Sequence, residues 1–298
     1  MLEAAIVVAR LLQYLGAAVL FGSSLFFVFA LPREGPGSAR ETRWARPLLL
    51  ASAVVLALSA LLAIAAQASL FAGSFEQGLA TGAIGDVVRY MDLGKAAAVR
   101  TGAAVLAMFA LTAIARGRAS WLAAAALGAL AAVSLAWMGH GAATEGPLHP
   151  LHLASDVLHA LAACAWLGAL AAFVPLALGT APRGVLLTAL RRFSAIGPFV
   201  VAVLVLTGAV NAWVLVGLDN LGAIAGTPYG RVLLAKLGLF AVMLALAAAN
   251  RFRHTPALAD DAPLSAIRRS LAVEAGAGLG VLGLVAWLGT LAPPGLAA

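Results

Sequence analysis

The chain consists of long, almost uninterrupted apolar runs separated by short polar joints rich in glycine and proline. About 20 apolar residues are enough to span the hydrocarbon core of a bilayer as a helix. The runs predict helices over residues 2–31, 47–72, 95–115, 119–138, 151–178, 194–217, 230–250 and 269–292. They are too long and too apolar for the strands of a membrane barrel. The sequence therefore predicts an all-α fold, a polytopic transmembrane bundle of about eight helices.

Composition supports a membrane protein without a soluble domain. Of the 298 residues, 63% are hydrophobic and 10% are charged, whereas soluble domains carry about 25% charged residues. No stretch between the apolar runs is long enough for a separate domain, so we expect a single transmembrane domain over residues 1–298. The first run contains Glu3 and Arg10 and lacks a basic leader, which indicates a retained helix rather than a signal peptide.

The distribution of basic residues predicts the orientation. The formal net charge is +7, and 13 of the 19 Lys and Arg residues fall in the loops after the first, third, fifth and seventh runs. They are Arg33, Arg40, Arg43, Arg46, Arg116, Arg118, Arg183, Arg191, Arg192, Arg251, Arg253, Arg268 and Arg269. The positive-inside rule places these loops in the cytoplasm and both termini outside, on the periplasmic or extracellular side. Topology thus explains the charge, and we expect no nucleic-acid partner.

With this orientation, seven of the eight helices place polar groups at one level near the outer surface. These residues are Arg10, Gln13, Gln67, Arg100, His140, His152, Asp156, His159, Asn211 and Lys236. Charges inside a bilayer are costly and usually face the bundle interior. Arg100 and Lys236 are also long enough to snorkel to the headgroups. We infer a polar pocket open to the outside, in which Arg10 or Lys236 compensates Asp156.

The joint after the fourth run and the start of the fifth hold a cluster of candidate metal ligands. They are Met138, His140, His149, His152, Asp156 and His159. On a helix, residues 152, 156 and 159 share one face, but the two histidines are about 10 Å apart along the axis. One ion can therefore bind Asp156 together with either histidine, with His140 as the leading additional ligand. The alternative is that these histidines are solvated or hydrogen-bonded within the bundle.

The ligand types indicate which metals suit such a site. Imidazole with carboxylate suits copper(II), zinc or nickel, and Met138 adds a soft ligand for copper(I). Deeper in the bundle the soft residues are Cys164, Met108 and Met243, which we interpret as core packing. The single cysteine excludes an intrachain disulfide.

The eighth run carries Glu274 in its cytoplasmic third. This carboxylate is either a structural partner of an arginine such as Arg251 or the inner end of a path across the membrane. The chain has no nucleotide-binding motif and no credible nucleophile–base pair, so we expect neither direct ATP drive nor an enzyme.

Three stretches together resemble a known family. They are Gly139-His140 followed by DxxHxxxxxxWLG at 156–168, RRFSAIGPFVVAVLVLTGAVNAW at 191–213, and TPYGRVLLAKLGLFAVMLALAAANRFRHTPAL at 227–258. Over residues 120–260 the chain resembles the copper-resistance protein D (CopD) family. The resemblance implies a polytopic inner-membrane protein of copper homeostasis, often found beside a periplasmic copper-binding protein. The residues in family-motif positions are His140, Asp156, His159, Asn211, Tyr229, Arg231 and Lys236.

The leading hypothesis is copper uptake or homeostasis across the bacterial inner membrane, with copper captured near the periplasmic face at His140, Asp156 and His159. The partners are then the copper ion, membrane lipid and, by resemblance, a periplasmic copper-binding protein. One alternative is a haem b electron-transfer protein with two axial histidines such as His140 and His159, although only His254 is available for a second haem near the inner face. Another is a metal sensor or scaffold that does not transport.

Overall fold

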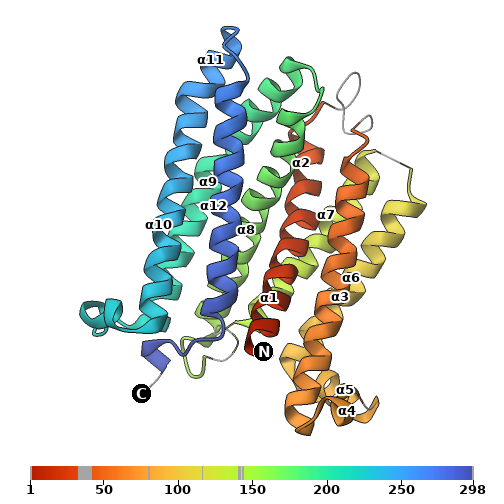
Figure 1. Ribbon diagram of the computed structural model, residues 1–298, viewed down its shortest axis with the longest axis vertical. Coiled ribbons are helices and arrows are strands. Elements are labelled where there is room, and N and C mark those ends of the chain that lie inside the picture. Colours follow the sequence, from red (N-terminus) through yellow and green to blue (C-terminus); the bar gives the residue numbers. More distant parts are fainter. Residues whose placement is uncertain are drawn as a thin grey trace.

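The structure is a computed structural model that describes residues 2–32, 42–79, 81–115, 117–139, 142 and 144–296. Within these ranges the regular elements are all helical, and eight helices are long and apolar enough to cross a membrane. The predicted all-α bundle with eight crossings is therefore confirmed. Figure 1 shows both termini at the same end of the bundle, as an even number of crossings requires.

The N-terminal half of the chain contributes four crossings. The first is α1 (Leu2–Ala18), which continues through the π-helical turn η1 (Val19–Ser23) into α2 (Ser24–Phe29). The next three are α3 (Ala45–Ala72), α6 (Asp92–Ala113) and α7 (Arg118–Ser134), the last extended by the 3-10 turn η2 (Leu135–Met138). Two short helices that the apolar runs did not predict, α4 (Phe75–Gly78) and α5 (Thr81–Tyr90), connect α3 to α6.

The C-terminal half contributes the other four crossings. They are α8 (His149–Leu178), α9 (Arg183–Val216), α10 (Pro228–Ala249) and α12 (Ser265–Leu288). α10 continues through the π-helical turn η4 (Asn250–His254) into α11 (Thr255–Ala259). The short turn η3 (Leu221–Gly226) precedes α10, and η5 (Pro294–Leu296) follows α12.

The start of α9 corrects the predicted boundary at residue 194. The helix begins eleven residues earlier, at Arg183, and includes the arginines that we had assigned to a loop. Val185, Leu186, Ala189 and Leu190 are buried, which is the spacing of one helical face. This first part of α9 is amphipathic. Its exposed arginines interrupt the apolar run, so a prediction based on uninterrupted apolar runs does not include it.

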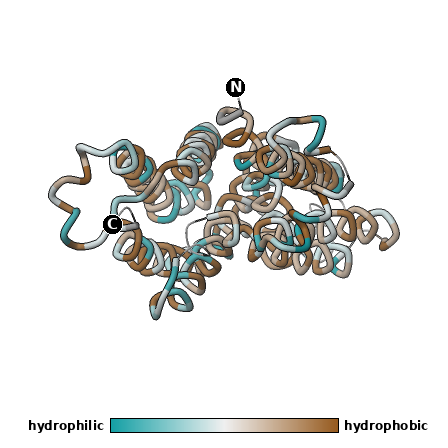
Figure 2. Tube along the Cα trace, turned by 90° about the horizontal axis from the view of Figure 1, so that it is seen from below, coloured by the Kyte–Doolittle hydropathy of each residue, from teal (hydrophilic) through white to brown (hydrophobic). Residues whose placement is uncertain are grey.

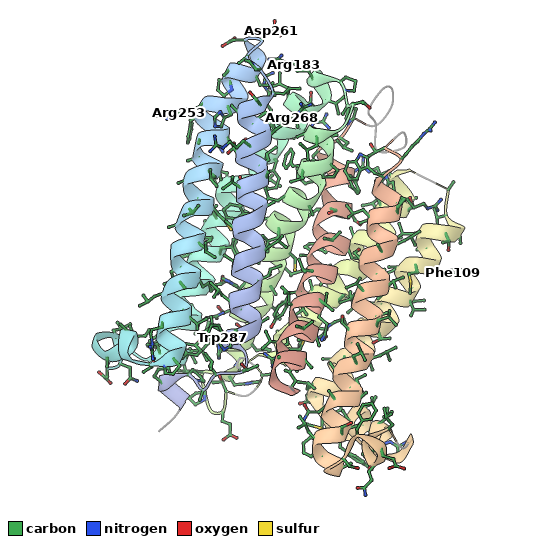
Figure 3. The ribbon with its side chains drawn as sticks, viewed as in Figure 1. Phe109, Arg183, Arg253, Asp261, Arg268 and Trp287 are labelled. Atoms are coloured by element: carbon green, nitrogen blue, oxygen red, sulfur yellow. The ribbon has the colours of Figure 1, made fainter. Side chains whose placement is uncertain are left out.

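The two ends of the bundle differ in charge. Arg183, Arg253 and Arg268 lie at the end opposite the termini, here called the arginine end (Figure 3). Arg33, Arg40 and Arg116 lie outside the described residues. The end that holds the termini is called the termini end. Placing the arginine end in the cytoplasm remains a prediction from the positive-inside rule.

The outer surface of the bundle suits a lipid environment. Figure 2 views the bundle from the termini end and shows hydrophobic positions along the helices. Large apolar side chains are well exposed on it, with Phe109 70%, Phe199 73% and Leu206 68% exposed. Apolar side chains exposed to this degree on long helices are the expected contacts of acyl chains.

A close contact between glycines joins the two halves of the bundle. A Cβ atom on Gly22 would lie 2.0 Å from the carbonyl oxygen of Cys164, and one on Gly168 would lie 2.1 Å from that of Ala18. The hydroxyl of Ser23 donates a hydrogen bond of 2.6 Å to the carbonyl of Gly168. Backbones in membrane bundles approach this closely only at small residues, so η1 and α8 are fixed against each other here.

Arg100 does not snorkel to the headgroups. Its side chain is completely buried, with 0% exposure. Its Nε donates to the hydroxyl of Ser134 at 3.1 Å, its Nη2 donates to the carbonyl of the same residue at 2.8 Å, and its Nη1 donates to Gln13. The guanidinium thereby ties α1, α6 and α7 together, because a planar group with five donors can serve several acceptors at once.

Candidate functional site

A cavity of about 230 Å³ lies among the helices of the C-terminal half, toward the termini end. α8, α9, α10 and α12 form most of its wall, and α1 and η2 complete it. The polar and ionisable residues that line it are Arg10, Tyr14, Asp156, His159, Cys164, Asn211, Tyr229 and Lys236. We call this space the outer cavity. It brings together six of the residues that the sequence singled out, Arg10, Asp156, His159, Asn211, Tyr229 and Lys236.

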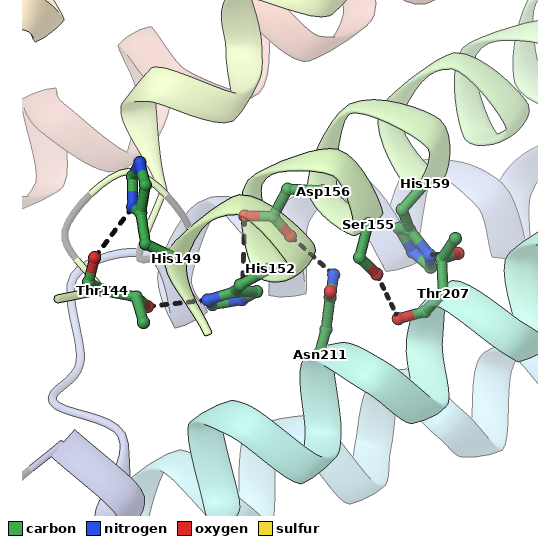
Figure 4. Close-up of polar contacts among 8 residues, drawn as sticks. All are labelled: Thr144, His149, His152, Ser155, Asp156, His159, Thr207 and Asn211. Atoms are coloured by element: carbon green, nitrogen blue, oxygen red, sulfur yellow. Dashed lines mark hydrogen bonds and ion pairs between the residues drawn. The ribbon is translucent and has the colours of Figure 1, made fainter. Parts of the chain in front are cut away.

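Asp156 is held in place from the facing helix. Asn211 of α9 donates a hydrogen bond from Nδ2 to Oδ1 of Asp156 at 2.6 Å. The neighbouring Ser155 donates to the carbonyl of Thr207 at 3.0 Å, which fixes the same turn of α8 against α9 (Figure 4). The amide oxygen of Asn211 is buried and accepts no hydrogen bond from a described residue. Asn211 therefore orients the carboxylate and offers one further oxygen.

The hydrogen bonds around His159 determine its tautomer. Its Nδ1 lies 2.8 Å from the hydroxyl oxygen of Thr207. That hydroxyl donates its one proton to the carbonyl of Val203 at 2.6 Å, so it accepts from His159. Nδ1 therefore carries the proton, and Nε2 of the neutral ring keeps its lone pair. Metal-binding histidines usually have this arrangement, in which one ring N–H is fixed by an acceptor and the other nitrogen ligates.

Two cationic side chains share the outer cavity with the single carboxylate. Arg10 donates from Nη2 to the carbonyl of Met138 at 2.7 Å, and its Nη1 is buried without a hydrogen-bond partner among the described residues. Lys236 lines the cavity from α10 and interacts electrostatically with Asp156. The cavity thus combines two basic side chains with one acidic side chain, and Lys236 is placed to compensate Asp156.

Two further predicted ligands, His149 and His152, do not line the outer cavity. His152 is completely buried, with Nδ1 2.7 Å from the hydroxyl of Thr144 and Nε2 4.0 Å from Oδ2 of Asp156. His149 donates from Nδ1 to the carbonyl of Thr144 at 2.8 Å (Figure 4). These histidines hold the joint before α8 against the helix.

Met138, Arg231 and His140 complete the predicted set. The side chain of Met138 is 7% exposed and packs in the hydrophobic core. Arg231 is exposed and is not part of the cavity wall. His140 lies outside the described residues.

The described residues do not form a complete metal-binding cluster. No group of three or more His, Cys, Asp and Glu side chains among them is arranged to hold one ion. Of the described candidates, Asp156 and His159 are the two that line the same cavity, one helical turn apart on α8. Cys164 lines it five residues further along α8, about 8 Å along the axis.

Sequence reasoning missed Thr207 and Tyr14. Thr207 lies one helical turn before Asn211, and Tyr14 one turn after Arg10, so each shares a face with a residue that was identified. That spacing is the signal that identifies them. It was overlooked because a hydroxyl in a membrane helix commonly bonds to its own backbone, as that of Thr207 does.

Glu274 lines a second cavity toward the arginine end. Of the two alternatives that the sequence left open for it, the pairing with Arg251 is not among its described contacts. Trp166 donates from Nε1 to Oε1 of Glu274 at 2.9 Å, and Asn250 donates from Nδ2 to Oε2 at 2.8 Å. The guanidinium of Arg251 instead donates to the carbonyl of Ser194.

These features define a multi-pass helical membrane protein with a partly buried polar site among its C-terminal helices. The chain belongs to the copper resistance protein D family. The profile described as "Copper resistance protein D-like, N-terminal domain" matches residues 1–150, and the profile described as "Copper resistance protein D" matches residues 187–288. The two together extend the resemblance well beyond residues 120–260.

Two characterised relatives agree with this assignment. "Copper resistance protein D" of Pseudomonas syringae pv. tomato is 36% identical over 306 residues, covering 96% of each chain. "Inner membrane protein YebZ" of Escherichia coli (strain K12) is 31% identical over 132 residues, covering 43% of this chain and 44% of that protein. No solved structure matches the chain.

Proposed function

We propose that this protein moves copper across the bacterial inner membrane and takes up the ion in the outer cavity from the periplasmic side. The family and the relatives named for copper resistance and for the inner membrane support the cargo and the location. The observation that carries the proposal is the pairing of Asp156 and His159 in one cavity, with Nδ1 of His159 engaged by Thr207 so that Nε2 is left to ligate.

The donors of the outer cavity suit copper as a substrate. Asp156 and His159 provide one carboxylate and one imidazole nitrogen, a combination that suits copper(II). The amide oxygen of Asn211 is a third donor on the adjacent helix. Cys164, deeper on the same wall, is the soft donor that copper(I) prefers.

Lys236 makes binding reversible in this proposal. In the metal-free state its ammonium neutralises Asp156, and an arriving copper ion competes with it for the carboxylate. Such competition lowers affinity, which favours release, because a transported ion must leave its site as readily as it binds.

A flux measurement tests the proposal. Purified protein is reconstituted into liposomes that contain a copper indicator, copper is added outside, and the initial rate of uptake is recorded. We expect the wild-type protein to take up copper. We expect the initial rate of uptake to be at least about tenfold lower in His159→Ala and in Asp156→Asn. His254→Ala, at the arginine end, is the matched control and retains wild-type flux.

The same preparation distinguishes the alternatives. Copper binding without flux in the wild type would contradict transport and favour a sensor or scaffold. Equal uptake of zinc would contradict selectivity for copper. Haem ligation has no support among the described residues, because His159 is the one described histidine that lines the outer cavity. A Soret band in the purified protein would contradict the proposal.

A further inference from the structure

The second cavity, here called the inner cavity, lies on the same four helices as the outer cavity. It has a volume of about 210 Å³ and is lined by residues of α8, α9, α12 and the end of α10 with η4. On α12, Val281 lines the outer cavity and Glu274 the inner one. Seven residues of helix correspond to about 10 Å. The two cavities are therefore stacked along the bundle axis.

Glu274 is a buried carboxylate whose hydrogen-bond partners are neutral. It is 2% exposed and accepts hydrogen bonds from two neutral donors, Trp166 and Asn250. It forms no ion pair with another described residue. An ionised carboxylate in apolar surroundings is costly unless it is paired or neutralised. A proton is the smallest species that neutralises it.

Asn250 is arranged to accommodate that proton. It is 7% exposed, and its Oδ1 is buried without a hydrogen-bond partner among the described residues. Turning the amide by half a turn exchanges Nδ2 and Oδ1, after which Oδ1 faces Glu274. That acceptor is satisfied only if Glu274 carries a proton and donates it as O–H···O. The pair thus has two hydrogen-bonded arrangements that differ by one proton.

Two features of the surrounding backbone and side chains point to function at this place. Asn250 opens the π-helical turn η4, and π-helical turns within α-helices are frequent at functional sites. Trp166, the other partner of Glu274, packs edge-on against Phe240 with ring centroids 6.0 Å apart. The next residue, Leu167, lines the outer cavity, whereas Trp166 lines the inner one. The indole therefore belongs to the layer that separates the two cavities.

We propose that Glu274 is a proton-binding site in the inner cavity and that its proton exchange changes the hydrogen bonding of Trp166 in the layer between the cavities. On binding, one proton from the aqueous solution adds to the carboxylate oxygen next to Asn250, and the resulting O–H donates a hydrogen bond to Oδ1 of the turned amide. The carboxylate that Trp166 contacts becomes a neutral acid, and the charge-assisted hydrogen bond to the indole becomes a weaker neutral one. Passage of copper between the two cavities then depends on the proton, a step that rests on the proposed copper transport.

The groups around Glu274 are consistent with proton exchange. From α8 and α9 it faces Trp166, aromatic and aliphatic side chains and Ser194, none of them charged. α12 adds Leu271 to the lining of the inner cavity, and η4 adds Asn250 and Arg251. The residues of α10 that line it, Leu244, Ala247 and Ala248, are uncharged. Arg251 is the other charged residue of the inner cavity, and it is engaged with the carbonyl of Ser194, a contact that links η4 to α9. It is thus placed to favour release of the proton without forming an ion pair.

Infrared difference spectroscopy of reconstituted protein without copper tests the proton site. Spectra recorded during a pH titration are compared between wild type and Glu274→Gln, which keeps an acceptor for Trp166 and cannot titrate. We expect a carboxylic acid C=O band that grows on acidification, shifts in D₂O and is absent from Glu274→Gln. The band persists but shifts in frequency in Asn250→Leu, because the acid loses its acceptor. Glu76→Gln, an exposed carboxylate on α4, is the control and retains the band.

The outcomes separate this inference from the transport proposal. A titration identical in wild type and Glu274→Gln would overturn the proton site, whether or not copper moves. Copper flux that responds equally to an imposed pH gradient in wild type and in Glu274→Gln would show that copper passage does not depend on the proton of Glu274. Loss of that response in Glu274→Gln, with copper binding at Asp156 and His159 unchanged, is the expected result. Absence of wild-type flux would contradict the proposed function alone, because the infrared titration does not require copper.

Discussion

The tautomer of His159 leads to a quantitative prediction about copper affinity. Thr207→Val keeps the size and β-branching of the side chain but removes the hydroxyl that accepts from Nδ1. The ring then loses the hydroxyl acceptor 2.8 Å from Nδ1 and keeps its contact to the backbone of Leu204. Weakening the hydrogen bonding of a buried polar group in this way costs up to about 1–3 kcal/mol. The variant therefore favours the tautomer whose Nε2 carries the proton and cannot ligate.

Copper binding must restore the Nδ1–H tautomer, so this cost reduces the affinity. With 1.4 kcal/mol for each tenfold, we expect Thr207→Val to weaken copper binding about 10- to 100-fold, the range typical of residues that hold a ligating histidine. Competition with a chelator of known affinity, in detergent solution, measures the change in Kd. His159→Ala sets the limit of complete ligand loss.

Two controls isolate the hydrogen bond. Thr207→Ser retains the hydroxyl and keeps the wild-type Kd within about twofold. Thr101→Val removes a comparable hydroxyl on α6, which bonds only to the carbonyl of Ala97, and leaves the Kd unchanged. Wild-type affinity in Thr207→Val, combined with lost binding in His159→Ala, would refute the tautomer argument. An equal loss in Thr207→Ser would show that packing, rather than the hydroxyl, is responsible.

Three further variants test other parts of the structure. Gly168→Val forces a side chain into the backbone of α1 and lowers the free energy of unfolding by at least about 3 kcal/mol. Thermal unfolding in detergent measures this loss. The control Gly238→Ala, whose Cβ meets no atom within 4 Å, keeps the wild-type Tm. Lys236→Met removes the ammonium that competes with copper for Asp156. We expect copper to bind about tenfold more tightly, the size of effect that one nearby charge has in a cavity, and to be released more slowly. Weaker binding would show that Lys236 does not compete with copper. Arg100→Ala leaves Gln13 without its buried donor and lowers the free energy of unfolding by about 3 kcal/mol. The folded fraction binds as much copper as wild type. Loss of bound copper would instead indicate that Arg100 belongs to the copper site.

The crossings could be predicted from the sequence because they depend on local apolarity. Six of the eight predicted helices agree with the structure to within a few residues at each end. One exception is α9, whose first eleven residues bury one face and expose Arg191 and Arg192. The other is the seventh crossing, which continues past residue 250 through η4 and α11 to Ala259. A polar or amphipathic segment that extends a membrane helix lacks the long apolar run on which the prediction relied.

The candidate site could be predicted in part. Asp156, His159, Asn211 and Lys236 were identified because ionisable and amide groups are rare in membrane helices and face the interior. Their meeting in one cavity depends on which faces α8, α9 and α10 turn toward each other, which no local pattern specifies. Proximity in the sequence also misled, since His149 and His152 bond to Thr144 instead.

Elemental analysis of purified, copper-loaded protein shows whether copper binds in the outer cavity through Asp156 and His159, as we propose. Wild type, Asp156→Asn, His159→Ala and the control His254→Ala are prepared in parallel. We expect copper bound to wild type and to the control, and its loss from both cavity variants. Undiminished copper in Asp156→Asn and His159→Ala would rule out this binding site.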